Sequence, residues 1–225
     1  MIERKVSCGM ATQKNSLVAY RKRRHFKRTP EPRGTRQSSA SQSLFVVQKH
    51  DASHLHYDVR IEINGVLKSW AVPKGISPKP AEKHLAIPTE DHPLSYAHFE
   101  GLIPAGEYGG GTVMVWDIGT YRNIKKVGNK LLSMDQCLKR GRIEVWLEGK
   151  KLKGGYALIK TAGMKTPTTK PGGRARRVPS GKKPFWLLLK MKDAHASKPI
   201  RNVTKSALTG RTMKQIAQES SEGKS

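Results

Sequence analysis

The sequence predicts a mainly β protein in which many short strands close into a barrel or pack as a sandwich. Three observations predict this fold class. Short runs rich in β-branched and aromatic residues recur between turn signals through the middle of the chain. The stretch "LHYDVRIEI" (55–63) alternates strictly between apolar and polar residues, as a half-buried strand does. It is followed by Asn64–Gly65, a residue pair typical of a tight β-hairpin turn.

Strands are expected where such a run lies between residues that favour turns. In chain order, the predicted strands are 44–50, 55–63, 66–72, 84–90, 112–121, 142–149, 155–163 and 185–192. A loop is expected at 73–80, and a glycine-rich loop at 101–111. The latter lacks the Lys-Ser/Thr pair of a phosphate-binding P-loop, so its glycines indicate a tight corner.

Two short helices are expected. Ser133 and Gln136 have the spacing of a capping box, and Gly141 can end the helix that they begin. The second helix is expected within 206–220. Short helices beside many strands leave the fold class mainly β.

Positive charge is concentrated at the two ends of the chain. The net charge is +26, with eleven basic and two acidic residues in 1–44, fourteen and twelve in 45–150, and eighteen and three in 151–225. Basic flanks around a nearly neutral middle indicate attraction to a polyanion, most simply nucleic acid. Tails that only keep the protein soluble, or an association with ribosomes, are the alternatives.

Composition divides the chain into three parts. They are a basic N-terminal arm and linker (1–43), a β domain (44–196) with a basic loop at 164–184 that we expect to be mobile, and a basic C-terminal tail (197–225). The N-terminus has no apolar signal core, and no apolar run approaches the roughly 20 residues of a membrane helix. Cys8 and Cys137 show neither ligand spacing nor a disulfide framework, so we expect a cytoplasmic protein.

One face of the 55–63 strand carries side chains suited to phosphate chemistry. Because side chains alternate between the faces of a strand, His56, Asp58 and Arg60 share one face, with neighbours about 7 Å apart. The guanidinium of Arg60 is well suited to hold phosphate oxygens in a bidentate way. The opposite face is apolar and suits a packed core. The alternative is an ordinary solvated face of alternating charge.

His50 extends this group if 44–50 pairs with 55–63 through the loop between them. Gln48 then lies on the same face of its strand as His50. Two imidazoles and one carboxylate, from His50, His56 and Asp58, suit Mn²⁺, Zn²⁺ or Fe²⁺ with positions left open for water and substrate. A hydrogen-bonded histidine pair at the surface is the alternative.

A second cluster lies in "EDHPLSYAHFEG" (90–101). His92 and Tyr96 could supply a proton carrier and a hydroxyl donor beside a phosphate. A turn at His92 with Tyr96 packed in the core is the alternative. Lys74, where a strand meets a turn, could contact phosphate or simply be exposed.

Longer stretches of the chain, together spanning roughly 20–217, resemble the 3′-phosphoesterase domain of bacterial ligase D, which also occurs as stand-alone bacterial and archaeal proteins. The matching segments are "RTPEP" (28–32), "FVVQKHDASHLHYDVRIEINGVLKSWAVPKG" (45–75), "EDHPLSYAHFEGLIPAGEYGGGTVMVWDIGTY" (90–121), "LEGKKLKGGYALIK" (147–160), "WLLLKMKDAHA" (186–196) and "LTGRTMKQIA" (208–217).

The resemblance implies a compact antiparallel β-barrel with short flanking helices. It also implies a Mn²⁺-dependent enzyme that heals 3′ ends. Such an enzyme trims a 3′-terminal ribonucleotide from a primer strand and removes the 3′-phosphate, leaving a 3′-OH. By match to the family motif, His50, His56 and Asp58 would bind the metal, and Arg60 and His92 would contact the phosphate.

The resemblance extends to residues around this group. Gln48 and Tyr96 would complete the site, and Lys74 would support it. Arg24 and Glu31 keep the family pattern in an N-terminal region that the family ties to removal of the ribonucleotide.

Two positions depart from the family pattern in ways that bear on activity, while Tyr156, where tryptophan is common, affects only packing. His25 stands where the family usually has an acidic residue, which puts ribonucleotide removal in doubt more than phosphate removal. His84 stands where an arginine is common near the phosphate, and histidine would bind phosphate less well near neutral pH.

Taken together, the sequence predicts a Mn-dependent phosphoesterase that acts on the 3′ end of a DNA or RNA-terminated primer–template duplex. A ligase or polymerase would act in trans, and a monomer is expected. The alternative is a non-catalytic nucleic-acid-binding barrel, motivated by the two departures, or a scaffold that recruits a repair enzyme.

Overall fold

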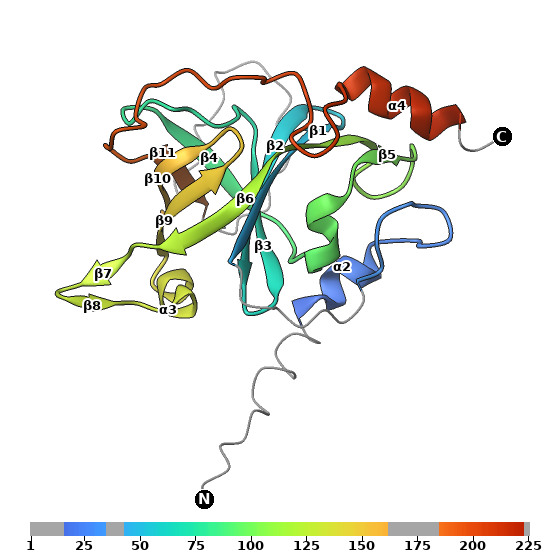
Figure 1. Cartoon of the computed structure of the whole chain (residues 1–225). Coiled ribbons are helices and arrows are strands. Elements are labelled where there is room, and N and C mark those ends of the chain that lie inside the picture. Colours follow the sequence, from blue (N-terminus) through green and yellow to red (C-terminus); the bar gives the residue numbers. More distant parts are fainter. Residues whose placement is uncertain (1–15, 35–42, 162–184, 223–225) are drawn as a thin grey trace, which may run out of the picture.

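The computed structural model describes residues 16–34, 43–161 and 185–222, and it is built mostly from strands (Figure 1). The strands are β1 (Leu44–Asp51), β2 (Leu55–Ile63), β3 (Val66–Val72), β4 (Lys83–Pro88), β5 (Gly101–Ile103), β6 (Gly111–Asn123), β7 (Lys126–Val127), β8 (Lys130–Leu131), β9 (Arg142–Gly149), β10 (Lys153–Lys160) and β11 (Trp186–Lys190). The helices are α2 (Val18–Lys22), the short 3-10 helix η1 (Leu94–His98), α3 (Met134–Lys139) and α4 (Met213–Glu222).

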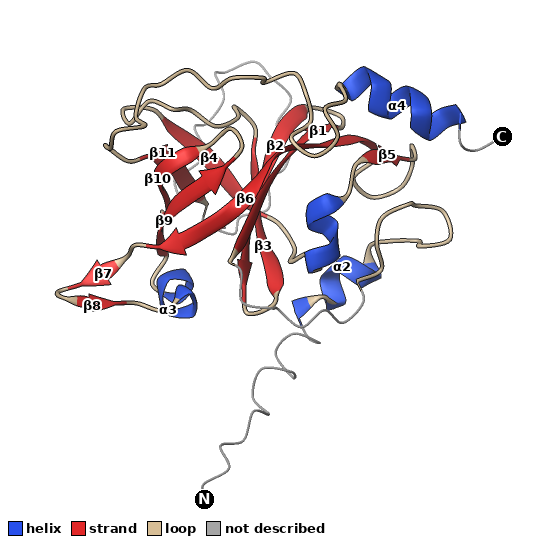
Figure 2. Cartoon of the chain, viewed as in Figure 1, coloured by secondary structure: helices blue, strands red, loops and turns tan. Residues whose placement is uncertain are grey.

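Eight antiparallel strands close into a barrel, in the order β1-β2-β3-β4-β11-β10-β9-β6. Pairing of β6 with β1 completes the ring, so the ring has no free edge. The short strand β5 adds to β6 outside the ring, and β7 and β8 form a separate ribbon (Figure 2). The mainly β fold class and the antiparallel barrel are confirmed.

The turn and the helix ends that local sequence patterns predicted are present in the structure. Asn64 and Gly65 have φ values of 55° and 78°, the left-handed pair that a tight hairpin turn requires. Ser133 caps α3, since its hydroxyl accepts from the Gln136 backbone while the Gln136 side chain accepts from the Ser133 backbone. Gly141 follows the helix with φ 70°, which favours glycine.

Several predicted boundaries differ from the structure, and two of them differ most. The loop predicted at 101–111 contains β5, because Gly101–Ile103 pairs with β6. No local sequence pattern predicts this pairing. The helix predicted within 206–220 begins only at Met213, because Thr212 caps it by accepting from the Gln215 backbone at 3.3 Å. The basic loop predicted at 164–184 lies outside the described residues.

The apolar side chains form two cores on opposite sides of the β1–β2 wall. One core fills the barrel, where Val59 and Ile61 of β2 pack with residues of β3, β6, β9, β10 and β11. The other lies outside the wall, where Tyr20 of α2 and Tyr96 of η1 cover Val46 of β1. The outer layer means that side chains on both faces of β1 and β2 are buried.

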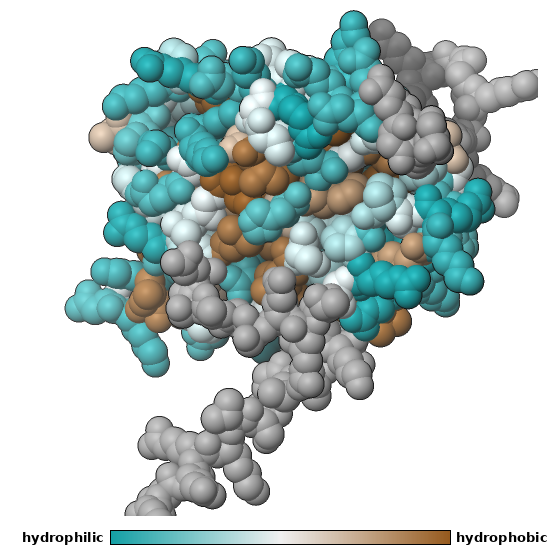
Figure 3. All heavy atoms as spheres, turned by 45° about the vertical axis from the view of Figure 1, so that its right-hand side comes forward, coloured by the Kyte–Doolittle hydropathy of each residue, from teal (hydrophilic) through white to brown (hydrophobic). Residues whose placement is uncertain are grey.

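The surface is otherwise largely polar. In the space-filling view, apolar residues gather near the middle of one face and hydrophilic side chains surround them (Figure 3). Within the described ranges, no helix is long and apolar enough to cross a membrane.

Candidate active site

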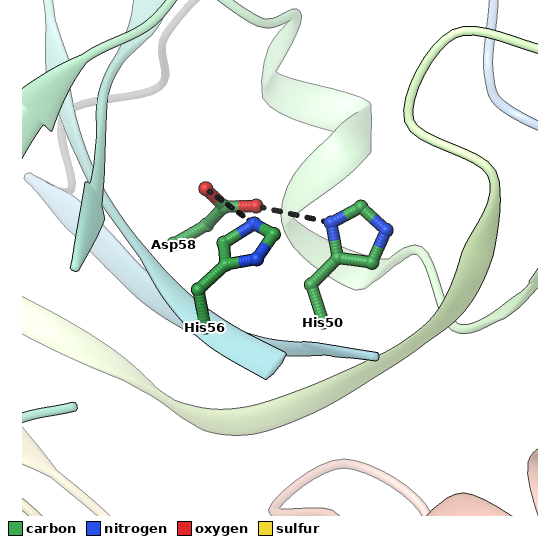
Figure 4. A group of neighbouring side chains, drawn as sticks. All are labelled: His50, His56 and Asp58. Atoms are coloured by element: carbon green, nitrogen blue, oxygen red, sulfur yellow. Dashed lines mark ion pairs between the residues drawn. The ribbon is translucent and has the colours of Figure 1, made fainter. Parts of the chain in front are cut away.

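The pairing of β1 with β2 brings the predicted metal ligands together. His50 lies directly opposite His56, and Gln48 lies opposite Asp58. All four side chains leave the outer face of the barrel wall, as strand alternation predicted. Figure 4 shows both imidazoles turned toward the carboxylate of Asp58.

The three side chains bring their ligand atoms close together. His50 Nδ1 lies 3.8 Å from Asp58 Oδ2, and His56 Nε2 lies 3.8 Å from Asp58 Oδ1. One ligand atom from each residue falls within 4.8 Å of the others. A separation of 3.8 Å is too long for a hydrogen bond, whereas two atoms bound to one ion at about 2.1 Å can lie up to about 4.2 Å apart.

Backbone carbonyls orient both imidazoles. His50 Nε2 donates to the carbonyl of Gly109 at 2.9 Å, and His56 Nδ1 donates to the carbonyl of His54 at 2.9 Å. Each ring therefore keeps its proton on the nitrogen that faces the backbone and turns the lone pair of the other nitrogen toward Asp58. Metal-binding histidines are typically oriented in this way.

Asp58 is held in its ionised form. Burial opposes ionisation, but the Arg60 guanidinium holds the pKa of Asp58 below its usual range. Arg60 donates to Asp58 Oδ2 at 2.9 Å. A carboxylate kept charged at neutral pH is suited to bind a cation.

Arg60 lies at the centre of a buried hydrogen-bond network. It donates to Gln48 at 2.7 Å and to Ser69 at 2.9 Å, and its guanidinium lies 2.9 Å from His92 Nδ1. With the bond to Asp58, hydrogen bonds to oxygen acceptors use three of its five N–H groups, while His92 Nδ1 also lies 2.9 Å from the carbonyl of Glu90. The protein thus fixes the orientation of Arg60.

Gln48 and Tyr96 support this arrangement from opposite sides. Gln48 donates to the carbonyls of Tyr96 and Phe99, each at 3.0 Å, and so ties η1 to the barrel wall. The ring of Tyr96 lies 4.9 Å from the Arg60 guanidinium. Both residues position Arg60.

His92 is buried between two guanidinium groups. Its Nδ1 faces Arg60, and its Nε2 lies 3.2 Å from Arg24. Burial and these two positive charges hold the pKa of His92 well below its usual 6.5. His92 is therefore neutral at neutral pH until an anion offsets the charge around it.

Arg24 joins the N-terminal segment to this network. Its guanidinium pairs with Glu31 at 2.8 Å and with Glu90 at 3.0 Å, in addition to the contact with His92. Tyr96 donates to the same Glu31 carboxylate at 3.0 Å, and burial raises the Tyr96 pKa well above 10. The division of the chain at residue 43 stays a prediction about domains, but this part of the arm packs directly on the barrel wall.

Three further residues singled out from the sequence have no contact with Arg60 or His92 among those that the described structure shows. Lys74 is exposed at the turn after β3. His84 contacts the carbonyl of Gly75 at 2.6 Å and lies 3.8 Å from Glu82. His25, one of the two departures from the family pattern, is 74% exposed and lies 3.0 Å from Glu107.

Sequence reasoning missed three parts of the network. Ser69 could have been found, since counting back from the Asn64–Gly65 turn places it opposite Arg60. Glu90 and the carbonyl of Gly109 carry no such signal, because long-range packing brings them to Arg24 and His50.

The model of one protein family matches this chain over residues 48–160, and its description is the DNA ligase D 3′-phosphoesterase domain. The matched range makes up half of the chain. It contains the three predicted metal ligands His50, His56 and Asp58, as well as Arg60 and His92. The chain belongs to this family. The resemblance seen in the sequence is therefore confirmed.

Similar proteins come from several bacteria. The multifunctional non-homologous end joining protein LigD of Pseudomonas aeruginosa is 44% identical over 182 residues, which is 80% of this chain and 19% of that protein. The corresponding DNA repair protein of Mycobacterium tuberculosis is 46% identical over 148 residues, 65% of this chain and 18% of that protein. LigD of Mycolicibacterium smegmatis is 39% identical over 187 residues, 82% of this chain and 22% of that protein. The chain thus spans about a fifth of the length of these relatives.

Proposed function

We propose that this protein is a metal-dependent phosphoesterase that removes the 3′-phosphate from a primer strand and leaves a 3′-OH for DNA repair. Membership in the 3′-phosphoesterase domain family supports the reaction class. The names of the relatives support a place in non-homologous end joining. The observation that carries the proposal is the orientation of His50 and His56, each turned by a backbone carbonyl so that a lone pair faces Asp58.

His50, His56 and Asp58 would hold the metal. Two imidazoles and one carboxylate suit Mn²⁺, and they also suit other divalent transition metals. When bound, the ion would polarise a phosphate oxygen and lower the pKa of an attacking water. The His56 side chain is 22% exposed, against 9% and 8% for His50 and Asp58, so substrate would approach from the His56 side.

Arg60 and His92 would contact the phosphate. Arg60 offers a fixed positive charge, which stabilises negative charge as it builds in the transition state. His92 is neutral in the free protein, and a phosphate dianion would offset the charges of Arg60 and Arg24 and raise the pKa of His92.

The other residues of the predicted site would act by positioning Arg60 and His92. Gln48 and Tyr96 orient Arg60, while Arg24 and Glu31 hold His92 and Tyr96 in place. Lys74 and His84 stay predictions as substrate contacts.

Removal of a 3′-terminal ribonucleotide is a second activity of the same proposal. His25 replaces the acidic residue usual in the family, and it bonds Glu107 at the surface. Arg24 and Glu31 are nevertheless paired and buried. A ligase or polymerase acting in trans, a monomeric state and a cytoplasmic location stay part of the proposal.

The proposal is tested with end-labelled primer–templates, with and without Mn²⁺. One primer ends in a 3′-phosphate and another in a single 3′-ribonucleotide. We expect metal-dependent loss of the phosphate, and loss of the ribonucleotide as well if the His25 replacement is tolerated. Absence of any metal-dependent product would contradict the proposal and favour a non-catalytic binding module.

Matched histidine variants test the metal assignment. His56→Ala should abolish turnover, whereas His54→Ala should not, because the exposed His54 supplies only its backbone carbonyl to His56. Undiminished activity of His56→Ala would overturn the assignment.

A further inference from the structure

A basic cleft lies outside the candidate active site, between the β9–β10 turn and the segment that follows β11. Its volume is about 450 Å³. Six basic side chains line it, namely Lys150, Lys151, Lys153, His195, Lys198 and Arg201. Among the described residues that line it, none is acidic. A concave surface lined by one sign of charge concentrates ligands of the opposite sign.

The floor of the cleft is held in place by the barrel. The buried carboxylate of Asp117 accepts from the backbone of Lys151 at 2.9 Å and of Leu152 at 2.7 Å. The Lys151 ammonium lies 5.0 Å from the ring centroid of Trp116, and Lys150 donates to the carbonyl of Ala207 at 2.6 Å. The β9–β10 turn is thereby joined to the chain segment around Ala207 without any ligand.

The positive charge in the cleft is not neutralised within the described structure. Lys153, Lys198 and Arg201 are exposed, and no described carboxylate pairs with them. Burial lowers the pKa of Lys151 to about 8, with Asp117 opposing this effect and the charge of Lys49 adding to it. A bound anion would relieve this repulsion.

The cleft is connected to β1 and β2, the strands that carry the predicted metal ligands His50, His56 and Asp58. Lys49 and Tyr57 alternate with the triad residues on β1 and β2, so their side chains leave the opposite face. Lys49 lies 6.0 Å from the Tyr57 ring, Tyr57 lies 5.3 Å from Trp116, and Trp116 contacts Lys151. These contacts run through the inner face of the barrel wall, where Trp116 is buried, and they join Lys151 at the cleft to β1 and β2.

We propose that this cleft binds the phosphodiester backbone of the nucleic-acid strand whose 3′ end lies at His50, His56 and Asp58. The identity of the ligand rests on the proposed function, while the cleft itself rests on its charge and shape. Lysine and arginine contacts to phosphates hold a strand in register without reading its sequence. The cleft would therefore increase affinity for a long strand and leave the chemical step unchanged.

The test uses a fluorescently labelled primer–template with a 3′-phosphate, and its binding is followed by anisotropy in the presence of EDTA. The variant Lys153→Ala/Lys198→Ala/Arg201→Ala removes three exposed charges that have no described ion-pair partner, so it should fold. We expect the slope of log K against log salt, measured from about 50 to about 200 mM, to fall by about 2.7, at roughly 0.9 per phosphate contact. Affinity at about 0.1 M salt should drop on the order of 10²-fold.

A control variant carries the same change of charge elsewhere. Lys126→Ala/Lys130→Ala/Arg140→Ala removes three exposed charges from the β7–β8 ribbon and the end of α3. Its salt slope should equal that of the wild type. Equal losses in both variants, or no loss in the cleft variant, would overturn the proposal.

Turnover separates this inference from the proposed function. On the long duplex, the cleft variant should show a raised KM and an unchanged kcat, and on a dinucleotide with a 3′-phosphate it should match the wild type. If the wild type releases no phosphate from either substrate, the proposed function fails, while the anisotropy comparison still decides whether the cleft binds the strand.

Discussion

The two faces of β2 are buried to a similar degree between Asp58 and Ile61 but differ completely in chemistry. On the inner face, Val59 and Ile61 are 5% and 2% exposed and pack in the barrel core. On the outer face, Asp58 and Arg60 are 6% and 3% exposed and take part in a polar network. One alternating stretch of sequence thus supplies both a hydrophobic core and a candidate active site.

The comparison shows that burial does not distinguish a structural face from a functional one. The inner face gains free energy as apolar surface leaves water. On the outer face, burying charges costs free energy that ion pairs offset only in part, so such a network adds little to stability. We therefore expect inner-face substitutions to affect unfolding and outer-face substitutions to affect activity.

The largest effect is expected for Asp58→Asn. This change keeps the shape of the side chain but removes the charge that faces both imidazoles and Arg60. The rate of phosphate release should fall on the order of 10³-fold, while the circular dichroism spectrum stays native. Asp51→Asn, at the exposed end of β1, is the matched control, and similar rates for the two variants would contradict the prediction.

The next effect concerns stability. Ile61→Ala should lower the free energy of unfolding by about 2–5 kcal/mol because it leaves a cavity in the barrel core. Urea denaturation measures this loss, and Ile61→Val should cost only about 0.5–1.5 kcal/mol. Turnover per folded molecule should stay near that of the wild type. The division between faces would fail if Asp58→Asn destabilised the protein more than Ile61→Ala.

A smaller effect is expected at Arg24, which extends the outer-face network into the N-terminal segment. Lysine cannot reproduce the fork of bonds to Glu31, Glu90 and His92. Arg24→Lys should therefore lower kcat/KM for a 3′-phosphate substrate roughly 10- to 100-fold, as loss of supporting contacts does at metal sites. Arg23→Lys changes the exposed neighbour, so its kcat/KM should stay close to that of the wild type.

The smallest effect is a pH dependence of stability caused by His92. Its folded pKa lies below the unfolded value of about 6.5, so below pH 6.5 the unfolded chain binds more protons than the folded chain. The free energy of unfolding should thus fall with decreasing pH, by at most about 1.4 kcal/mol per pH unit. His92→Gln should lose this part of the slope between about pH 7 and pH 5 in urea titrations. His98→Gln, at an exposed histidine, should keep it.

The sequence by itself determined the local structure and the composition of the site. Strict alternation in 55–63 separated the face that carries His56 and Asp58 from the face that packs in the core, because successive side chains of a strand point to opposite sides. The Asn64–Gly65 turn set the register that pairs Arg60 with Ser69. Ser133 set the start of α3, since its cap is formed by residues three positions apart.

The tertiary structure alone decided what surrounds that face. Arg24 reaches His92 across 68 residues, and Gly109 reaches His50 across 59. It also decided that a barrel forms, through the pairing of β1 with β6, and that His84 contacts the carbonyl of Gly75. Local periodicity assigns side chains to faces, but contacts between distant segments depend on how whole faces fit together, and no short stretch of sequence encodes that fit.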